Sequence, residues 1–258
     1  MFKNWYGRAN GKPRAAVQQL LWLIGLIVAW ELVARLKLVN PLLLPSASAV
    51  AVRMAVGLWE GTLALQLLQS IGLVLAGLVI SSLIGFFLSC LDYFLPVSRP
   101  LIKLLNAMFH PLPGVAILPL VLALAGLGLK SVFIVIVHAI VWSSYLSIST
   151  GFRSVGQDYV DAALNVGANW WQLVWHILLP ISSQQIVTGL KIGWSRGWRA
   201  LISAEMIFSA IGALGGIGWY LFERRAFMDV TGLYAGICLV ILTGVVMENG
   251  LFGRWSET

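Results

Sequence analysis

Long apolar stretches alternate with shorter polar ones along this 258-residue chain, and six of the apolar stretches are about 20 residues or longer. An α-helix rises 1.5 Å per residue, so about 20 apolar residues cross the roughly 30 Å hydrocarbon core of a bilayer. We therefore predict an all-α membrane protein with six transmembrane helices, folded as a single domain over residues 1–258. The predicted spans are Val17–Leu36, Leu63–Leu91, Leu104–Leu127, Ser131–Gly151, Ile181–Ile211 and Thr231–Phe252.

Two of the connecting stretches are too polar or too broken to span a membrane. In Pro41–Glu60 we predict a short surface helix that begins at Ser46 or Ser48, because a serine oxygen can accept hydrogen bonds from the first turn. The second stretch, Ala210–Asp229, is expected to be an outer loop. Glycines would make it bendable and aromatic residues would anchor it at the interface, namely Gly212, Gly215, Gly216, Gly218, Trp219, Tyr220 and Phe222.

Charge is scarce, and its distribution indicates orientation. Only 10% of the residues are charged, whereas a soluble domain carries about 25%. The net charge of +7 is spread over short connections, so we interpret it as membrane orientation and expect no nucleic-acid partner. We predict that both termini, the tail 1–16 and the loop 152–180 are cytoplasmic, and that the first span is retained. The basic residues on that side are Lys3, Arg8, Lys12, Arg14, Arg99, Lys103, Arg153 and Arg254.

The loop between the fourth and fifth spans contains the sequence DAALNVGANWWQLVWHILLP, which covers residues 161–180. Asp158 or Asp161 can begin a short helix, since an acidic residue favours a helix N-terminus, and Gly167 can end it. An apolar strip at helical spacing then runs to Pro180, which we expect to end the segment before the fifth span. Such a strip could lie on the membrane surface, pack on its own domain or insert into a partner protein.

The spacing in this loop resembles the EAA loop of ATP-binding-cassette (ABC) importer permeases, although an aspartate stands where that family usually has glutamate. The resemblance implies that a cytoplasmic coupling helix contacts a separate ATPase through Asp161, Ala162, Ala163, Gly167, Ile177, Leu179 and Pro180. Three further segments resemble the taurine, nitrate and sulfonate branch of these permeases. They are Pro111-Leu112-Pro113, Gly189-Leu190-Lys191-Ile192-Gly193 and Ala204-Glu205-Met206-Ile207.

This resemblance carries expectations about fold and partners. It implies a type I importer permease in the bacterial cytoplasmic (inner) membrane, paired with a second permease copy as a homodimer. It also implies two ATPase subunits and an extracytoplasmic binding protein that delivers a small anion such as a sulfonate or nitrate. The chain lacks the G-x-x-x-x-G-K-[ST] phosphate loop. We therefore expect a transport subunit rather than an enzyme, with no bound cofactor and with ATP and magnesium on the partner ATPases.

The fifth span holds an unusual density of charge. Lys191, Arg196, Arg199 and Glu205 fall within one crossing, although a charge at the bilayer centre costs roughly 2.5–3.5 kcal/mol. At about 100° per residue, Arg196 and Arg199 share a face with Ser203, whereas Lys191 and Glu205 lie on the other face. The arginines could line a path for an anion, because a guanidinium presents a planar fork of donors. Alternatively, they pair with Glu31, Glu205 or Glu248 and stabilise packing or the subunit interface.

Small residues and aromatic residues mark two further helix faces. The glycines at small-xxx-small spacing would let another helix approach the fifth span closely, namely Gly189, Gly193 and Gly197. In the fourth span, one face could form a polar wall of the path or an interface between helices, and its residues are His138, Trp142, Tyr145 and Ser149. No histidine or carboxylate lies near His138 in the sequence, so we expect no metal site.

Two alternative functions are compatible with these features. The importer could carry an aromatic or heterocyclic solute such as a vitamin precursor, which would suit the twelve tryptophans and the aromatic face of the fourth span. An ion-coupled secondary transporter or a membrane enzyme is the other alternative. A secondary transporter would more often show internal repeats with broken helices, and no such repeat is visible.

Overall fold

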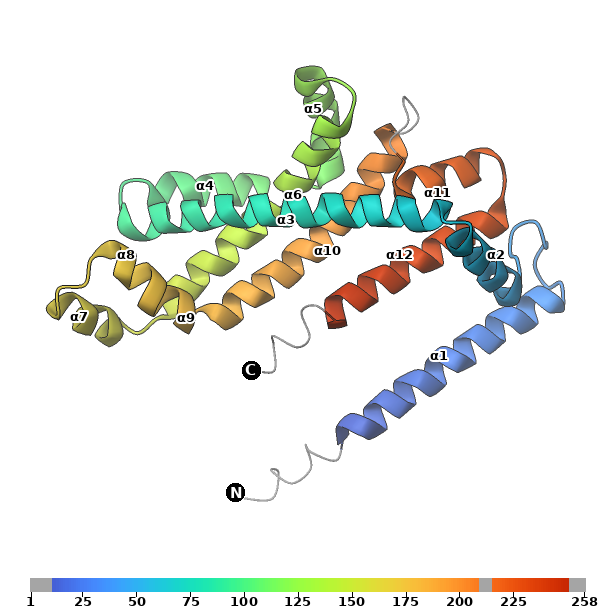
Figure 1. Cartoon of the computed structure of the whole chain (residues 1–258), viewed down its shortest axis with the longest axis horizontal. Helices are drawn as coiled ribbons and strands as arrows, with labels where there is room; N and C mark the ends of the chain where they lie inside the picture. The colour runs from blue at the N-terminus through green and yellow to red at the C-terminus, as the bar shows by residue number, and fades with distance from the viewer. Residues whose placement is uncertain (1–10, 209–214, 251–258) are drawn as a thin grey trace.

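The computed structural model describes residues 11–208 and 215–250, and every regular element in this part of the chain is helical. The helices are α1 (Gly11–Arg35), α2 (Ala47–Trp59), α3 (Thr62–Phe94), α4 (Arg99–Phe109), η1 (Gly114–Ile117), α5 (Leu118–Ala125), α6 (Leu129–Ser154), α7 (Gln157–Asn165), α8 (Trp170–Leu173), η2 (Val174–Leu178), α9 (Leu179–Ile181), α10 (Ser183–Phe208), α11 (Ile217–Ala226) and α12 (Val230–Gly250). Figure 1 shows their arrangement.

Four described helices are long and apolar enough to cross a membrane, and six crossings result if each of two sharply bent helix pairs counts as one. The single helices α1, α3, α6 and α12 coincide with the first, second, fourth and sixth predicted spans. The predicted all-α membrane fold is therefore confirmed. The ends of the fifth and sixth predicted spans lie outside the described residues, as do Lys3, Arg8, Gly212 and Arg254.

The third predicted span, Leu104–Leu127, is interrupted rather than continuous. Helix α4 ends at Phe109, and the following pair η1 and α5 is bent from it by 97°. Pro111 and Pro113 explain the break, because a proline cannot donate to the helical ladder and disfavours helical geometry in the residue before it. The break leaves an irregular stretch at the start of η1, beside α10.

The main core forms where α3, α6 and α10 pack against one another near the middle of the molecule (Figure 1). Glycines allow this close approach, because a Cβ atom at Gly85 of α3 would lie only 2.8 Å from the Tyr145 backbone nitrogen of α6. On α10, a Cβ atom at Gly197 would lie 2.5 Å from the Ile140 Cδ1, and one at Gly189 would overlap the Ser147 side chain. Small residues thus set the separation of the three central helices.

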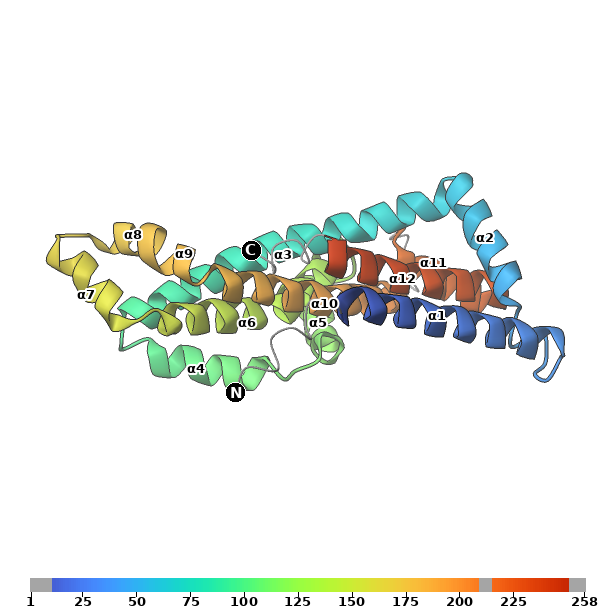
Figure 2. The ribbon, with the colours of Figure 1, turned by 90° about the horizontal axis from the view of Figure 1, so that it is seen from below.

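Helices α1 and α2 lie at the edge of the molecule (Figure 2). The short helix predicted in Pro41–Glu60 is confirmed as α2, and Ser46 is its N-cap, since the Ser46 Oγ accepts from the Ala49 N–H at 3.3 Å. Only 6% of the apolar stretch of α1 is buried. Its contacts include a hydrogen bond of 3.0 Å from the Trp30 Nε1 to the Pro45 carbonyl. The chain therefore leaves a largely apolar, unburied face on α1 for lipid or a partner.

The predicted outer loop Ala210–Asp229 is wrong for most of its described part, which forms helix α11. Tyr220 and Leu221 of this helix are buried against the core, so Tyr220 cannot act as an exposed interface anchor. The start of α11 is tied down by Glu205, whose carboxylate accepts from the Gly218 N–H at 2.8 Å. A buried acceptor at a free helix N-terminus favours helix over an open loop.

Asp229 joins three helices at the end of α11. Its Oδ2 accepts from Arg53 of α2 at 3.2 Å and from Arg224 of α11 at 3.4 Å, and its Oδ1 accepts from the Gly232 N–H of α12 at 2.9 Å. Partial burial acts to raise the pKa of this carboxyl, but the hydrogen bonds from Gly232 and Arg53 outweigh it, so the pKa lies below its ordinary value of 3.8. The ionised carboxylate therefore stabilises the junction.

Candidate functional site

The segment between α6 and α10 folds as two short helical pieces. Helix α7 follows Gly156, and its Asp161 accepts from the Gln157 side chain at 2.9 Å. Gly167 has a φ of +84°, a left-handed conformation that ends a helix and favours glycine. Asn169 then begins α8 with a capping box to Gln172. The helical run extends through Pro180 to Ile181 and bends by 73° into α10, so Pro180 is not its last residue as predicted.

This segment, residues 157–181, which we call the coupling segment, buries one face and exposes the other. Val160, Leu173, Val174 and Leu178 join a second apolar cluster with Phe152 and its neighbours at the end of α6. The opposite face is open, with Tyr159 and Trp170 each 62% exposed. Of the residues matched to the EAA spacing, Asp161, Ala162, Gly167 and Pro180 are exposed, and the half-buried ones are Ala163, Ile177 and Leu179.

An open cavity of about 350 Å³ lies where α10 meets the break after α4. Its lining includes Arg196, Arg199 and Ser203 of α10 and the stretch His110–Gly114. The Arg196 guanidinium donates to the His110 carbonyl at 3.2 Å, and its Nη2 lies 3.0 Å from the His110 Nε2. Because a guanidinium only donates, the His110 Nε2 accepts, which places the proton of a neutral ring on Nδ1.

The two arginines carry charge that no described acid neutralises. Glu31 binds Arg35 at 2.6 Å, Glu248 lies 3.5 Å from Lys191, and Glu205 accepts hydrogen bonds from the Ser70 hydroxyl at 2.9 Å. Within one chain, Arg196 and Arg199 therefore pair with none of these three acids. Arg199 is exposed and donates its Nε–H to the Ser195 carbonyl at 3.1 Å. Most of its guanidinium remains available to a ligand.

Other residues predicted to line a path lie elsewhere. Glu205 is 1% exposed and caps α11, whereas Lys191 pairs across to α12. Tyr145 is buried at the contact between α6 and α3. His138 and Trp142 lie nearer the cavity, because Phe109, which precedes His110, stacks on Trp142 at a centroid distance of 5.4 Å and meets His138 edge-on at 6.1 Å.

His110 lines the cavity, although the sequence pattern did not assign it to the path. Its sequence signal is its position directly before the proline-rich break, where a helix end leaves a carbonyl free. A second groove of about 350 Å³ follows the same α10 face and is lined by polar side chains of α6 and α10, namely Ser147, Thr150, Gln184, Gln185 and Thr188. Polar groups thus continue along α10 from the coupling segment toward Arg199.

Residues 77–249 match the family described as binding-protein-dependent transport system inner membrane component. The chain belongs to this family and is an inner-membrane permease subunit of an ABC importer. Relatives that are 22–29% identical include proteins named as permeases for taurine, aliphatic sulfonates, nitrate and formylaminopyrimidine. The family implies an ATPase and a binding protein as partners.

Two relatives and one solved structure illustrate the similarity. The chain is 29% identical to the taurine transport system permease protein TauC of Escherichia coli. The alignment of 231 residues covers 88% of this chain and 82% of that protein. It is 26% identical over 232 residues to the formylaminopyrimidine transport permease protein ThiX of Halalkalibacterium halodurans, with 90% of each covered. Its fold is similar to the inward-facing MetNI methionine ABC transporter, with a TM-score of 0.63 at 15% identity, over 78% of this chain and 96% of that one.

Proposed function

We propose that this permease moves a small organic anion, such as a sulfonate, through a path lined by Arg196 and Arg199. The observation that carries the proposal is the cavity in which both arginines lie beside Ser203 with no described acid to neutralise them. A guanidinium matches the geometry of sulfonate and carboxylate oxygens with two parallel donors. The similarity to TauC supports a sulfonate as the first anion to test.

The position of the arginines on a membrane helix supports a water-accessible path. An unpaired charge that faces lipid is costly. Arg199, and the polar groove that lies between it and the coupling segment, therefore need contact with water, a ligand or a partner helix. A second copy of this chain facing α10 would enclose such a path. We therefore include a homodimer in the proposal, with the N-terminus and the coupling segment in the cytoplasm.

We further propose that the coupling segment of each permease copy docks into one of two separate ATPase subunits, which bind ATP and magnesium. Its exposed face carries large apolar side chains next to Asp161 and Gly167, as expected of a surface that a partner covers. ATP-driven closure of the partner dimer would move this segment and turn the helices outward. A binding protein would then deliver the anion, and hydrolysis would restore the inward-facing state.

A heterocyclic solute is a second candidate substrate, and a specific feature favours it. Phe109, His138 and Trp142 form an aromatic group beside the cavity. Both ring nitrogens of His138 and the Trp142 Nε1 are buried without a partner among the described residues. Such atoms could hydrogen-bond a flat polar ring. The similarity to ThiX points the same way.

Uptake of radiolabelled taurine into proteoliposomes that contain the complete complex tests the anion proposal. Arg196→Ala and Arg199→Ala should each reduce uptake at least tenfold, while Arg225→Ala, an exposed arginine of α11 away from the cavity, should leave it unchanged. Membrane expression of all three should match the wild type. Equal losses of uptake and expression for the cavity variants would assign the arginines a packing role. Unchanged uptake would exclude them from the path.

A further inference from the structure

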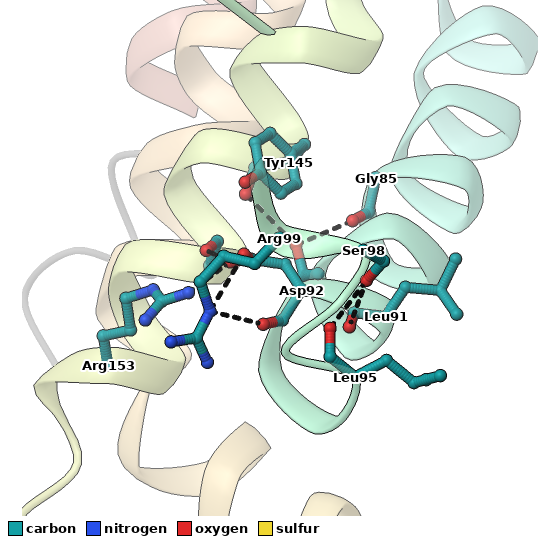
Figure 3. Close-up of polar contacts among 10 residues, drawn as sticks. Gly85, Leu91, Asp92, Leu95, Ser98, Arg99, Tyr145 and Arg153 are labelled. Atoms are coloured by element: carbon teal, nitrogen blue, oxygen red, sulfur yellow. Dashed lines mark hydrogen bonds and ion pairs between the residues drawn. The ribbon is translucent and has the colours of Figure 1, made fainter. Parts of the chain in front are cut away.

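Asp92, near the end of α3, is a buried carboxylate that lies outside both the cavity and the coupling segment. Its side chain is 1% exposed, and its Oδ2 accepts from the Arg153 Nη2 at 2.6 Å and from the Ser149 Oγ at 2.7 Å, both on α6. From α4, the Arg99 Nε lies 3.7 Å from the Asp92 Oδ1 and donates to the Asp92 carbonyl at 3.2 Å. Figure 3 shows both arginines beside Asp92. One residue thus connects the ends of α3 and α6 with the beginning of α4.

The coupling segment packs beside this junction through apolar residues, and an open cavity of about 650 Å³ is lined by Arg99, Arg153 and residues of α7 and α8. Phe152, one residue before Arg153, meets Phe86 and Tyr93 of α3 edge-on at 6.3 and 6.0 Å. The same apolar cluster contains Val160 of α7 and Leu173 of α8, and it is separate from the main core. Because packed clusters resist deformation, a displacement of the coupling segment should carry the ends of α3 and α6 with it.

Helix α4 leads from this junction to the arginine cavity. Among its residues only Ile102 is buried, so its position depends mainly on its two ends. One end is Arg99 at the Asp92 junction. The other end is Phe109, which stacks on Trp142, followed by His110, which accepts from Arg196. The eleven residues of α4 span about 16 Å as a rigid helix.

We propose that Asp92 and Arg99 are positioning residues that transmit movement of the coupling segment, through α4, to the arginine cavity. When the ends of α3 and α6 shift, the Arg99 contact makes α4 follow. His110 then moves relative to Arg196 and releases guanidinium donors that it holds in this structure, so the cavity alternates between binding and releasing an anion. This inference rests on the proposed docking of the coupling segment to an ATPase.

The first experiment compares ATP hydrolysis with taurine uptake in the reconstituted complex. Arg99→Ala removes the contact between α4 and Asp92 but leaves the bonds from Arg153 and Ser149 in place. We expect ATP hydrolysis to be retained and uptake per ATP to fall about tenfold, a size typical of coupling between sites. Arg99→Lys should recover part of the loss, and Lys103→Ala, an exposed residue one turn further along α4, should have no effect.

A double variant tests whether the two residues act through each other. Asp92→Asn removes the charge that faces Arg99 but keeps the Asp92 carbonyl that accepts from it, so uptake per ATP should fall less than in Arg99→Ala, and the double variant should resemble Arg99→Ala. Independent, multiplying losses would contradict the proposal. A proportional fall in hydrolysis and uptake for Arg99→Ala would show a merely structural role, and unchanged uptake would show that α4 transmits nothing.

A distance measurement that needs no anion separates this inference from the substrate assignment. Spin labels at Met108→Cys on α4 and Val52→Cys on α2, with Cys90 and Cys238 changed to serine, report movement of α4 by electron paramagnetic resonance. The distance should change when a non-hydrolysable ATP analogue is added, and Arg99→Ala should abolish the change. A shift that persists in Arg99→Ala would overturn the proposal. If the wild type shows the distance change, Arg99→Ala abolishes it and taurine is still not taken up, only the substrate assignment is overturned.

Discussion

Among Gly189, Gly193 and Gly197 of α10, we expect an added methyl group to be tolerated least at Gly189. A Cβ atom there would overlap the Ser147 Cβ, which is fixed to the backbone of α6 and cannot rotate away. At Gly193 the nearest atoms are the Ile140 Cγ2 at 3.0 Å and the Leu78 Cδ1 at 3.2 Å, which are side-chain ends that can shift. Gly189→Ala must therefore push α10 away from α6, and Gly193→Ala is its matched control.

The expected magnitude follows from the kind of overlap. Overpacking a tight interface costs about 1–3 kcal/mol, and the fixed position of the Ser147 Cβ puts Gly189→Ala at about 2–3 kcal/mol. For a chain of this size each kcal/mol corresponds to about 2–4 °C in Tm, so the midpoint should fall by roughly 4–12 °C. Gly193→Ala should cost about 1 kcal/mol or less. Because α10 carries both cavity arginines, the larger change should also reduce uptake.

Thermal unfolding of the purified protein in nanodiscs, followed by tryptophan fluorescence, measures this difference. Ser147→Gly removes the atom that the new methyl group would meet, so the double variant with Gly189→Ala should recover most of the lost Tm. Two results would refute the reasoning. One is a Tm for Gly189→Ala equal to that of Gly193→Ala, and the other is no recovery in the double variant.

Three further predictions concern other parts of the chain. Gly167→Trp and Asp161→Arg, on the exposed face of the coupling segment, should abolish ATP-dependent uptake while membrane insertion, measured by immunoblot, stays normal; surviving uptake would contradict the proposed docking. Glu205→Ala leaves the Ser70 hydroxyl and the Gly218 N–H without an acceptor, so unfolding should become easier by about 1–3 kcal/mol for each donor left unpaired, and Ser70→Ala should also destabilise because it leaves the Ile217 N–H without an acceptor. The pKa of the Asp229 carboxyl is lowered, so the ionised carboxylate stabilises the folded protein above pH 3.8, and this stabilisation is lost as the pH falls through the lowered pKa. Measured against pH, Tm should therefore fall at acid pH in the wild type and change less in Asp229→Asn.

The spans and the coupling segment could be predicted from local sequence. Hydrophobic run length sets the crossing helices, and the positive φ of Gly167 is a position that favours glycine. The cap of α2 at Ser46 follows from the same kind of local rule. Pro111 marked the break after Phe109 in the sequence. Because the apolar run continues across this break, the length of the run does not reveal the bend.

The polar partners could not be predicted, because each pair lies far apart in the sequence. Glu205 accepts from Ser70 across 135 residues, and Arg196 donates to His110 across 86 residues. A helical wheel places Arg196 on a face but does not say which helix approaches that face. Asp92 gave no signal beyond being a charge near the end of an apolar run. Such contacts depend on the crossing of α3, α6 and α10, which close packing at glycines determines.

The most direct test of the central claim is the ATPase activity of the membrane complex, purified through a tag on this chain. The complex is assayed with its binding protein loaded with taurine, other sulfonates, nitrate or a pyrimidine. The account predicts that an ATPase co-purifies and that a sulfonate-loaded binding protein stimulates ATP hydrolysis. Stimulation by the pyrimidine alone would replace the anion with a heterocyclic substrate. The absence of a co-purifying ATPase, under conditions that preserve such complexes, would contradict the coupling role of residues 157–181.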